Sequence, residues 1–129
     1  MELNLKGKHV VVTGGANGLC YDIAEAYQEA GADLCIVDIA PNIAESAKAL
    51  GKSREVKYYK CDLSKLEQLP ADYEAIRELC GERIDVLFNG AGIQYRAKAE
   101  EFPLPKWKLI LDINLSAVFV LSQLAGKDM

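Results

Sequence analysis

Four short apolar runs, each followed by a segment with helical periodicity, constrain the fold of this chain more than any other feature. The runs, which we predict to be strands, cover residues 8–14, 33–39, 55–61 and 83–89. The segments that follow them, which we predict to be helices, cover residues 19–31, 41–51, about 72–81 and 107–127. Strands that alternate with helices predict an α/β fold, in which right-handed crossovers build a parallel sheet.

The same alternation predicts the arrangement of the sheet. A doubly wound sheet of four strands has the order 3-2-1-4, with helices on both faces and a ligand crevice where the winding reverses between strands 1 and 4. We therefore expect residues 1–129 to form a single Rossmann-type domain with an incomplete sheet. The fourth run contains IDVLF, which is too apolar for an exposed sheet edge, so we expect something to cover it.

Composition and charge narrow the classes of function. The formal net charge of −4 provides no basic face for nucleic acid or an anionic membrane. The four cysteines form no C-x-x-C motif, and the only histidine, His9, is far from the predicted crevice, so we expect reduced thiols and no metal site. The first residues lack the apolar core of a signal peptide, and residues 107–125 are too polar for a membrane span, so we expect a cytoplasmic protein.

The turn between the first strand and the first helix reads TGGANGLC. Gly14 permits a sharp bend, and Gly18 lets the backbone approach a pyrophosphate at the N-terminus of the helix. Asp38 ends the second strand, where a carboxylate can accept hydrogen bonds from the ribose hydroxyls of adenosine. These features predict a dinucleotide site. A flavodoxin-like domain with ordinary glycine turns is the alternative that the residues leave open.

Four segments resemble motifs of the short-chain dehydrogenases/reductases, in the family's order and spacing. TGGANGLC resembles the T-G-x-x-x-G-x-G turn, CDL the segment beside adenine, NGAG the N-N-A-G motif, and DINLSAVF the segment that holds the catalytic asparagine. The resemblance implies that the chain is the N-terminal, cofactor-binding half of such an enzyme, with NAD as cofactor. The segment NGAGIQYRAKAEEFPLPKW is similar to the gluconate and 2-dehydro-3-deoxy-gluconate dehydrogenases, which implies a sugar-acid substrate.

The resemblance also implies a set of site residues. Asn114 is implied to be catalytic. In a complete enzyme Arg96 could pair with a sugar-acid carboxylate, while a solvated loop arginine is the alternative. The cofactor is implied to contact Thr13, Gly14, Asn17, Gly18, Leu19, Asp38, Asp62, Leu63, Asn89, Gly90, Ala91 and Gly92.

Three positions depart from the motifs. Cys20 stands where the family has its third glycine, Gly90 replaces an asparagine, and Tyr95 stands where the sugar-acid branch has a second arginine. Because a glycine at position 20 lets the first helix pack closely on the sheet, we expect a shifted helix and weaker cofactor binding. The Cys20 thiol is either an inert small side chain or a redox-sensing group at a helix N-terminus.

A larger departure concerns proton transfer. The family uses a tyrosine whose pKa is lowered by a lysine in Y-x-x-x-K, and none of the six tyrosines here has that spacing to a lysine. Tyr73 and Arg77 are the nearest imitation, and we expect them on an exposed helix face. These 129 residues alone are therefore expected to show no turnover. The chain is either part of an enzyme or a half-domain that binds a nucleotide or a partner chain without catalysis.

The predicted last helix favours self-association. Together with the apolar fourth strand, it would expose more apolar surface than a monomer tolerates. We therefore expect a homodimer or a larger assembly through the strand edge, the helix or both, and we expect Trp107 to anchor the helix in the core. The apolar residues of this helix include Leu109, Ile110, Ile113, Val118, Leu121 and Leu124.

Overall fold

The computed structural model describes residues 3–129, and within them a parallel sheet of four strands forms the centre of the fold. The strands are β1 (His9–Thr13), β2 (Asp33–Asp38), β3 (Lys57–Lys60) and β4 (Val86–Asn89). Their order is β3-β2-β1-β4, and each neighbouring pair is parallel. The predicted α/β class and strand order are therefore confirmed.

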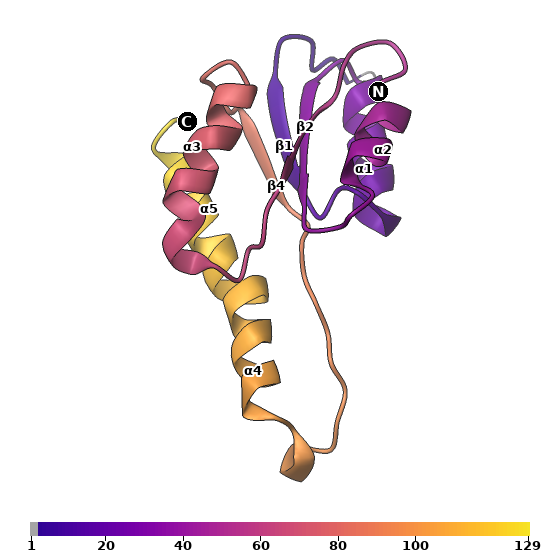
Figure 1. Cartoon of the computed structure of the whole chain (residues 1–129). Coiled ribbons are helices and arrows are strands. Elements are labelled where there is room, and N and C mark those ends of the chain that lie inside the picture. Colours follow the sequence, from indigo (N-terminus) through magenta and orange to yellow (C-terminus); the bar gives the residue numbers. More distant parts are fainter. Residues whose placement is uncertain (1–2) are drawn as a thin grey trace.

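The same residues form five α-helices, of which four pack on the sheet and α4 extends beyond it. α1 and α2 cover one face of the sheet, and α3 and α5 cover the other (Figure 1), as predicted. The 3₁₀ turns η1 (Leu66–Gln68) and η2 (Ala99–Glu101) precede α3 and α4, and a π-helical turn, η3 (Asp112–Ser116), joins α4 to α5. The helices are α1 (Gly18–Glu29), α2 (Ile43–Leu50), α3 (Leu69–Leu79), α4 (Leu104–Leu111) and α5 (Ala117–Gly126).

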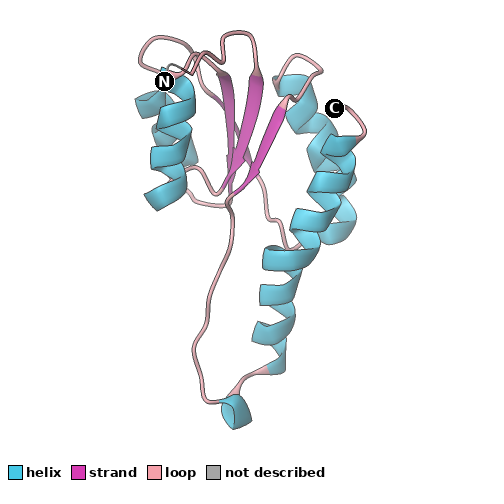
Figure 2. Ribbon diagram, turned by 180° about the vertical axis from the view of Figure 1, so that it is seen from behind, coloured by secondary structure: helices cyan, strands magenta, loops and turns pink. Residues whose placement is uncertain are grey.

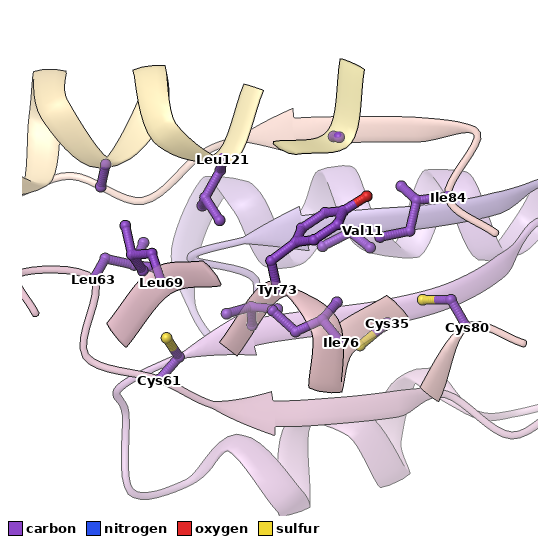
Figure 3. Close-up of a cluster of buried hydrophobic side chains, with 13 residues drawn as sticks. Val11, Cys35, Cys61, Leu63, Leu69, Tyr73, Ile76, Cys80, Ile84 and Leu121 are labelled. Atoms are coloured by element: carbon purple, nitrogen blue, oxygen red, sulfur yellow. The ribbon is translucent and has the colours of Figure 1, made fainter. Parts of the chain in front are cut away.

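Side chains of the central strands alternate between two apolar layers. Val10, Val12 and Ile36 pack beneath α1 and α2, whereas Val11 and Cys35 pack beneath α3 and α5 (Figure 3). Because helices cover both faces, the strands are apolar in succession rather than in alternation. The two layers hold the sheet as a frame, and the loops at its carboxyl ends are positioned by that frame.

The starts of α2 and α3 differ from the predictions. α2 begins at Ile43 rather than at Pro41, which lies in the turn before it. α3 begins at Leu69 and has Pro70 in its first turn. A proline is tolerated there because the N–H that it lacks would have no partner within the helix. Pro70 therefore starts α3 rather than delaying the helix to residue 72.

Tyr73 and Arg77 on α3 do not form the exposed face that the sequence predicted. The side chain of Tyr73 is buried, with 6% of the residue exposed, because α5 covers this part of α3. The Tyr73 hydroxyl donates a hydrogen bond to Asp128, and Arg77 Nε lies 3.2 Å from the same carboxylate. Both residues therefore attach the segment that follows α5 to α3.

The last helical segment extends beyond the sheet, beside the loop that leaves β4 (Figure 2). It begins at Leu104 rather than at Trp107. Trp107 lies on this extension, is 56% exposed and packs edge-on against Phe102, with 6.4 Å between the ring centroids. The prediction that Trp107 anchors the core is wrong, because no sheet lies beneath this part of the helix.

Residues 104–126 also differ from the prediction about membranes. They form a helical segment of 23 residues whose most apolar window has a mean hydropathy of 1.7 and is 17% buried. Length and composition alone therefore allow this segment to cross a membrane, although the sequence analysis excluded it on its polar residues. In this structure Ala117, Leu121 and Ala125 of α5 pack against the layer that α3 shares with the sheet.

Candidate functional site

A crevice opens at the carboxyl ends of the strands, where the winding of the sheet reverses. Its cavity has a volume of about 400 Å³. The lining includes nine of the predicted cofactor residues: Gly14, Asn17, Leu19, Asp38, Asp62, Leu63, Gly90, Ala91 and Gly92. It also includes five residues that the sequence analysis did not assign to the cofactor: Cys20, Ile39, Cys61, Ile93 and Ile113.

The glycine turn brings β1, α1 and the loop after β4 close together. Gly14 has a φ of +74°, and a Cβ there would lie 2.9 Å from the Cα of Ala91. Only glycine adopts this conformation without strain and permits this approach. Asn17 precedes α1 in an extended conformation and makes no side-chain capping bond, so backbone N–H groups of the first turn remain available to a ligand.

Thr13 holds the loop after β4 in this structure, and its predicted contact with the cofactor stays a prediction. Its side chain is buried, and its hydroxyl oxygen accepts hydrogen bonds from the backbone N–H groups of Gly90 (3.0 Å) and Ala91 (3.1 Å). Thr13 therefore holds the loop after β4 and is not part of the cavity lining. Asn89 also points elsewhere, since its amide donates to the Ser122 hydroxyl at 3.1 Å. The sequence alone does not indicate whether a polar residue at a strand end faces the cavity or supports a loop.

The Asp38 carboxylate is fixed by two backbone groups. Its oxygens accept hydrogen bonds from the N–H groups of Ala16 and Ala40, each at 3.1 Å. Beside it, Asn17 and Asn42 exchange amide hydrogen bonds of 3.2 and 2.9 Å, which connect the glycine turn to the loop after β2. The negative group is thus held at the rim of the cavity, and its neighbours there are neutral amides.

Asp62 also lines the cavity. It accepts hydrogen bonds from the backbone N–H (3.0 Å) and the hydroxyl (2.6 Å) of Ser64, and these bonds lower the pKa of its carboxyl group. Cys61, next to it, is buried and donates to Asp72, and burial together with that carboxylate raises the pKa of its thiol to about 12. Cys61 is therefore a protonated, structural thiol. Among residues 3–129 no group of three or more His, Cys, Asp or Glu is placed to hold a metal ion.

Asn114 lies in the π-helical turn η3, and both ends of its amide bind the backbone of Ile93. Its Oδ1 accepts from the Ile93 N–H at 2.9 Å, and its Nδ2 donates to the Ile93 carbonyl at 2.8 Å. The side chain thereby imitates a strand partner for the loop that leaves β4. Its predicted catalytic role stays a prediction. In this structure Asn114 is a residue that positions the mouth of the crevice.

Cys20, in the first turn of α1, points at the loop after β4. Its Sγ lies 3.4 Å from the carbonyl oxygen of Gly90. Partial burial and the neighbouring Asp38 carboxylate raise the pKa of the thiol. A redox-sensing thiol needs the opposite shift, since the thiolate is the reactive form. Of the two alternatives that the sequence left open, the geometry favours the inert side chain.

Comparison with known proteins decides the family. A model of the family described as short chain dehydrogenase matches residues 8–129. The chain belongs to that family. Its four motifs thus have the origin that the resemblance implied, and its sheet order and glycine turn are those of a dehydrogenase domain.

Two curated relatives and a solved structure illustrate the match. The chain is 35% identical to a 2-dehydro-3-deoxy-D-gluconate 5-dehydrogenase of Bacillus subtilis, covering 98% of this chain and 49% of the relative. It is 38% identical to a D-threitol dehydrogenase of Mycolicibacterium smegmatis, covering 99% and 50%. A proposed NAD(P)-dependent gluconate 5-dehydrogenase from Beutenbergia cavernae, with NADP bound at low occupancy, superposes with a TM-score of 0.88 at 34% identity, covering 100% of this chain and 51% of that one. The chain spans about half the length of these relatives.

Proposed function

We propose that the chain is the cofactor-binding half of a short-chain dehydrogenase and holds a nicotinamide dinucleotide in the crevice. The observation that carries the proposal is the convergence of the uncapped N-terminus of α1, the close approach at Gly14 and the Asp38 carboxylate on one cavity. Backbone N–H groups at a helix N-terminus suit a pyrophosphate, and a carboxylate at the end of β2 suits ribose hydroxyls. The residues present therefore fit the group.

NAD is the preferred form of the cofactor in this proposal. A 2′-phosphate at the adenosine ribose would meet the charge of Asp38, and the nearby Asn17 and Asn42 supply no positive charge. The solved relative from Beutenbergia cavernae contains NADP, so the family does not fix the choice. The preference proposed here rests on the residues at the rim of this cavity.

In the complete enzyme the proposed reaction is reversible oxidation of a sugar-acid hydroxyl. Bound NAD would supply the hydride acceptor for the carbon that bears the hydroxyl, and the hydroxyl proton would pass to a base, for which these 129 residues contain no Y-x-x-x-K tyrosine. The names of relatives such as the Bacillus subtilis dehydrogenase support a sugar-acid substrate. Within this chain, Asn114 would fix the wall of the crevice through Ile93, and the exposed Arg96, just beyond that wall, would meet a carboxylate.

A second candidate is a half-domain that binds a nucleotide or a partner chain without catalysis. It is favoured by one observation, the lack of a Y-x-x-x-K motif in these 129 residues. Without a proton donor near the substrate oxygen, hydride transfer has no accompanying proton step. The mass of the natural product in cells separates the two candidates, since a mass near 14.2 kDa favours the half-domain and a larger one favours the enzyme.

We also propose that the chain forms a homodimer or a larger assembly in the cytoplasm. Within the described residues β4 pairs with β1 alone, so its outer edge is open. One face of the last helical segment carries exposed apolar side chains. We call this set the arm stripe: Leu104, Trp107, Leu111, Leu115 and Phe119. Exposed edges and apolar stripes of this kind are normally covered by another chain or segment.

Titration of the full chain with NADH and NADPH tests the cofactor proposal. NADH should bind more tightly, and Asp38→Asn should reduce its advantage by about fivefold, because roughly 1 kcal/mol is expected from one charge at about 4 Å in water. Asp85→Asn at the opposite end of the sheet is the matched control and should leave the ratio unchanged. Equal or tighter binding of NADPH by the unaltered chain would refute the role given to Asp38.

A further inference from the structure

Two of the three departures from the family motifs lie against each other. Cys20 lies in the first turn of α1, and Gly90 follows β4, seventy positions along the chain. The thiol donates a weak hydrogen bond to the Gly90 carbonyl at 3.4 Å. Both residues line the same cavity. Because these two departures from the family motifs contact each other and line one cavity, we consider them as a pair.

The contact leaves no room for a side chain at position 90. A Cβ there would overlap Cys20 Sγ, and it would lie 2.7 Å from the Thr13 carbonyl oxygen and 3.2 Å from Phe88. The sulfur is the nearest of these obstacles. By contrast, a Cβ at Gly126 would meet no atom within 4 Å. Gly90 is thus a glycine for reasons of space, and its φ does not lie in the left-handed range.

The peptide at Gly90 is held from both sides. Its N–H donates to the Thr13 hydroxyl, and its carbonyl accepts from the Cys20 thiol. The next residue, Ala91, packs against Gly14 so closely that no Cβ fits between them. Since the thiol is kept protonated by its surroundings, it remains a donor at neutral pH. The strand-end wall of the crevice is therefore set partly by the sulfur.

We propose that Cys20 and Gly90 are a coupled pair of positioning residues for the cofactor. The thiol occupies the space that a side chain at position 90 would need, and the pair fixes the β4 wall against the dinucleotide. The extra atoms at position 20 are accommodated at position 90 instead of by displacing α1, so Cys20 need not weaken cofactor binding. The inference rests on the proposed cofactor site, and it adds a determinant that the motifs do not contain.

A double-mutant cycle on the full chain tests the coupling, with Cys20→Ala, Gly90→Ala and both together. Dissociation constants for NADH and NADPH and the midpoint of thermal unfolding are measured for each. Gly90→Ala should weaken binding at least about tenfold and Cys20→Ala less than about threefold, and the double variant should recover at least about threefold of the loss, since residues in contact commonly couple at this level. Gly126→Ala is the matched control and should bind as the unaltered chain does.

Alkylation of Cys20 separates a place in the cofactor wall from a purely structural role. The other three thiols are buried, so N-ethylmaleimide at alkaline pH should modify Cys20 first, and Cys20→Ser gives the background rate. Saturating NADH should slow the reaction in proportion to the occupied fraction of the chain. An unchanged rate at saturation would place the thiol outside the cofactor wall and overturn the proposal.

The other possible outcomes also support or overturn the proposed pair. An equal loss from Gly90→Ala with and without the Cys20→Ala substitution, in binding and in unfolding midpoint, overturns the pair. If Gly90→Ala folds only when it is combined with Cys20→Ala, the pair is supported. If it folds in neither case, the Thr13 carbonyl oxygen, 2.7 Å from the added Cβ, limits position 90 by itself, and the pair is overturned. If the unaltered chain binds neither nucleotide, the proposed function fails, while the unfolding midpoints still show whether positions 20 and 90 are coupled.

Discussion

The sheet beneath α1 and α2 and the last helical segment differ in how far their apolar side chains are buried. Beneath α1 and α2, the strand residues Val10, Val12 and Ile36 are fully buried. On the last helical segment, residues 104–126, which we call the arm, Leu115 is 64% exposed and Phe119 is 63% exposed. Helices cover the sheet on both faces, whereas α4 extends past the sheet (Figures 1 and 2).

The difference shows which apolar faces of the fold are covered by other residues among those described. The face of the sheet under α1 and α2, which we call the complete side, is covered within the chain, because each of these helices follows a strand and packs directly back onto the sheet. The arm stripe has no such cover among the described residues, so its stability must come from another surface. The cofactor crevice lies between the two regions, with the glycine turn on the complete side and Asn114 on the arm.

Catalysis provides the largest expected difference between the two regions. A protein that consists of these 129 residues should show NAD-linked turnover of gluconate-type substrates at least about 100-fold lower than the same protein joined to a segment with Y-x-x-x-K. The reason is that the complete side supplies cofactor contacts and no residue here supplies the proton. Steady NADH production by the 129 residues, abolished by Asn114→Ala, would contradict the assignment of the active site.

Stability should separate the regions next. Ile36→Ala creates a cavity in a fully buried layer and should cost about 2–5 kcal/mol. Leu115→Ala, measured at concentrations where the chain is monomeric, should change the free energy of unfolding by less than about 0.5 kcal/mol. Urea unfolding of both variants gives the comparison. Equal losses would mean that the arm packs against its own chain in solution.

The oligomeric state in solution tests the role of the arm stripe alone. Leu115→Asp combined with Phe119→Asp places two charges on the arm stripe and should convert a dimer or larger assembly to a monomer at micromolar concentration, as read by light scattering. Ala49→Asp on the exposed face of α2 is the control and should leave the mass unchanged. A monomeric unaltered chain would contradict the assembly proposal itself.

The sequence predicted the complete side well, because its determinants are local. The short crossover through α1 places β2 beside β1, and the bend at Gly14 needs a φ that glycine adopts without strain. Apart from the starts of α2 and α3, the errors concern positions whose surroundings depend on distant elements. Tyr73 is buried only because α5 lies over α3, and Trp107 is exposed only because α4 extends past the sheet.

The same limit applies to the site. Thr13 and Asp38 both end strands and both carry oxygen, but one faces inward to the loop after β4 and the other faces the cavity. The direction of each side chain follows from the pleat and from contacts with residues far along the chain. Nothing in the sequence near residue 114 announces a π-helical turn either, because one extra residue leaves helical periodicity almost unchanged over so short a segment.

The smallest expected effect concerns acid stability at the crevice. The hydrogen bonds from Ser64 lower the folded-state pKa of Asp62, so their contribution is present above the ordinary carboxyl pKa of about 4 and is lost as the pH falls through the lowered value. Ser64→Ala should therefore reduce stability above about pH 4 and make no difference once Asp62 is protonated. Unfolding midpoints across that range measure it. An equal loss at all pH values would assign the effect to something other than this carboxylate.

The π-helical turn has a consequence for how the molecule can change over evolutionary time. A π-helical turn holds about one residue more than an α-helical turn, so it absorbs an extra residue while the helix on each side keeps its orientation. Deleting one residue between 112 and 116 would therefore restore a regular helix and leave Ala117, Leu121 and Ala125 facing α3. The Asn114–Ile93 bonds would be lost in that single step, so the mouth of the crevice can change over evolutionary time while the packing of α5 on α3 is kept.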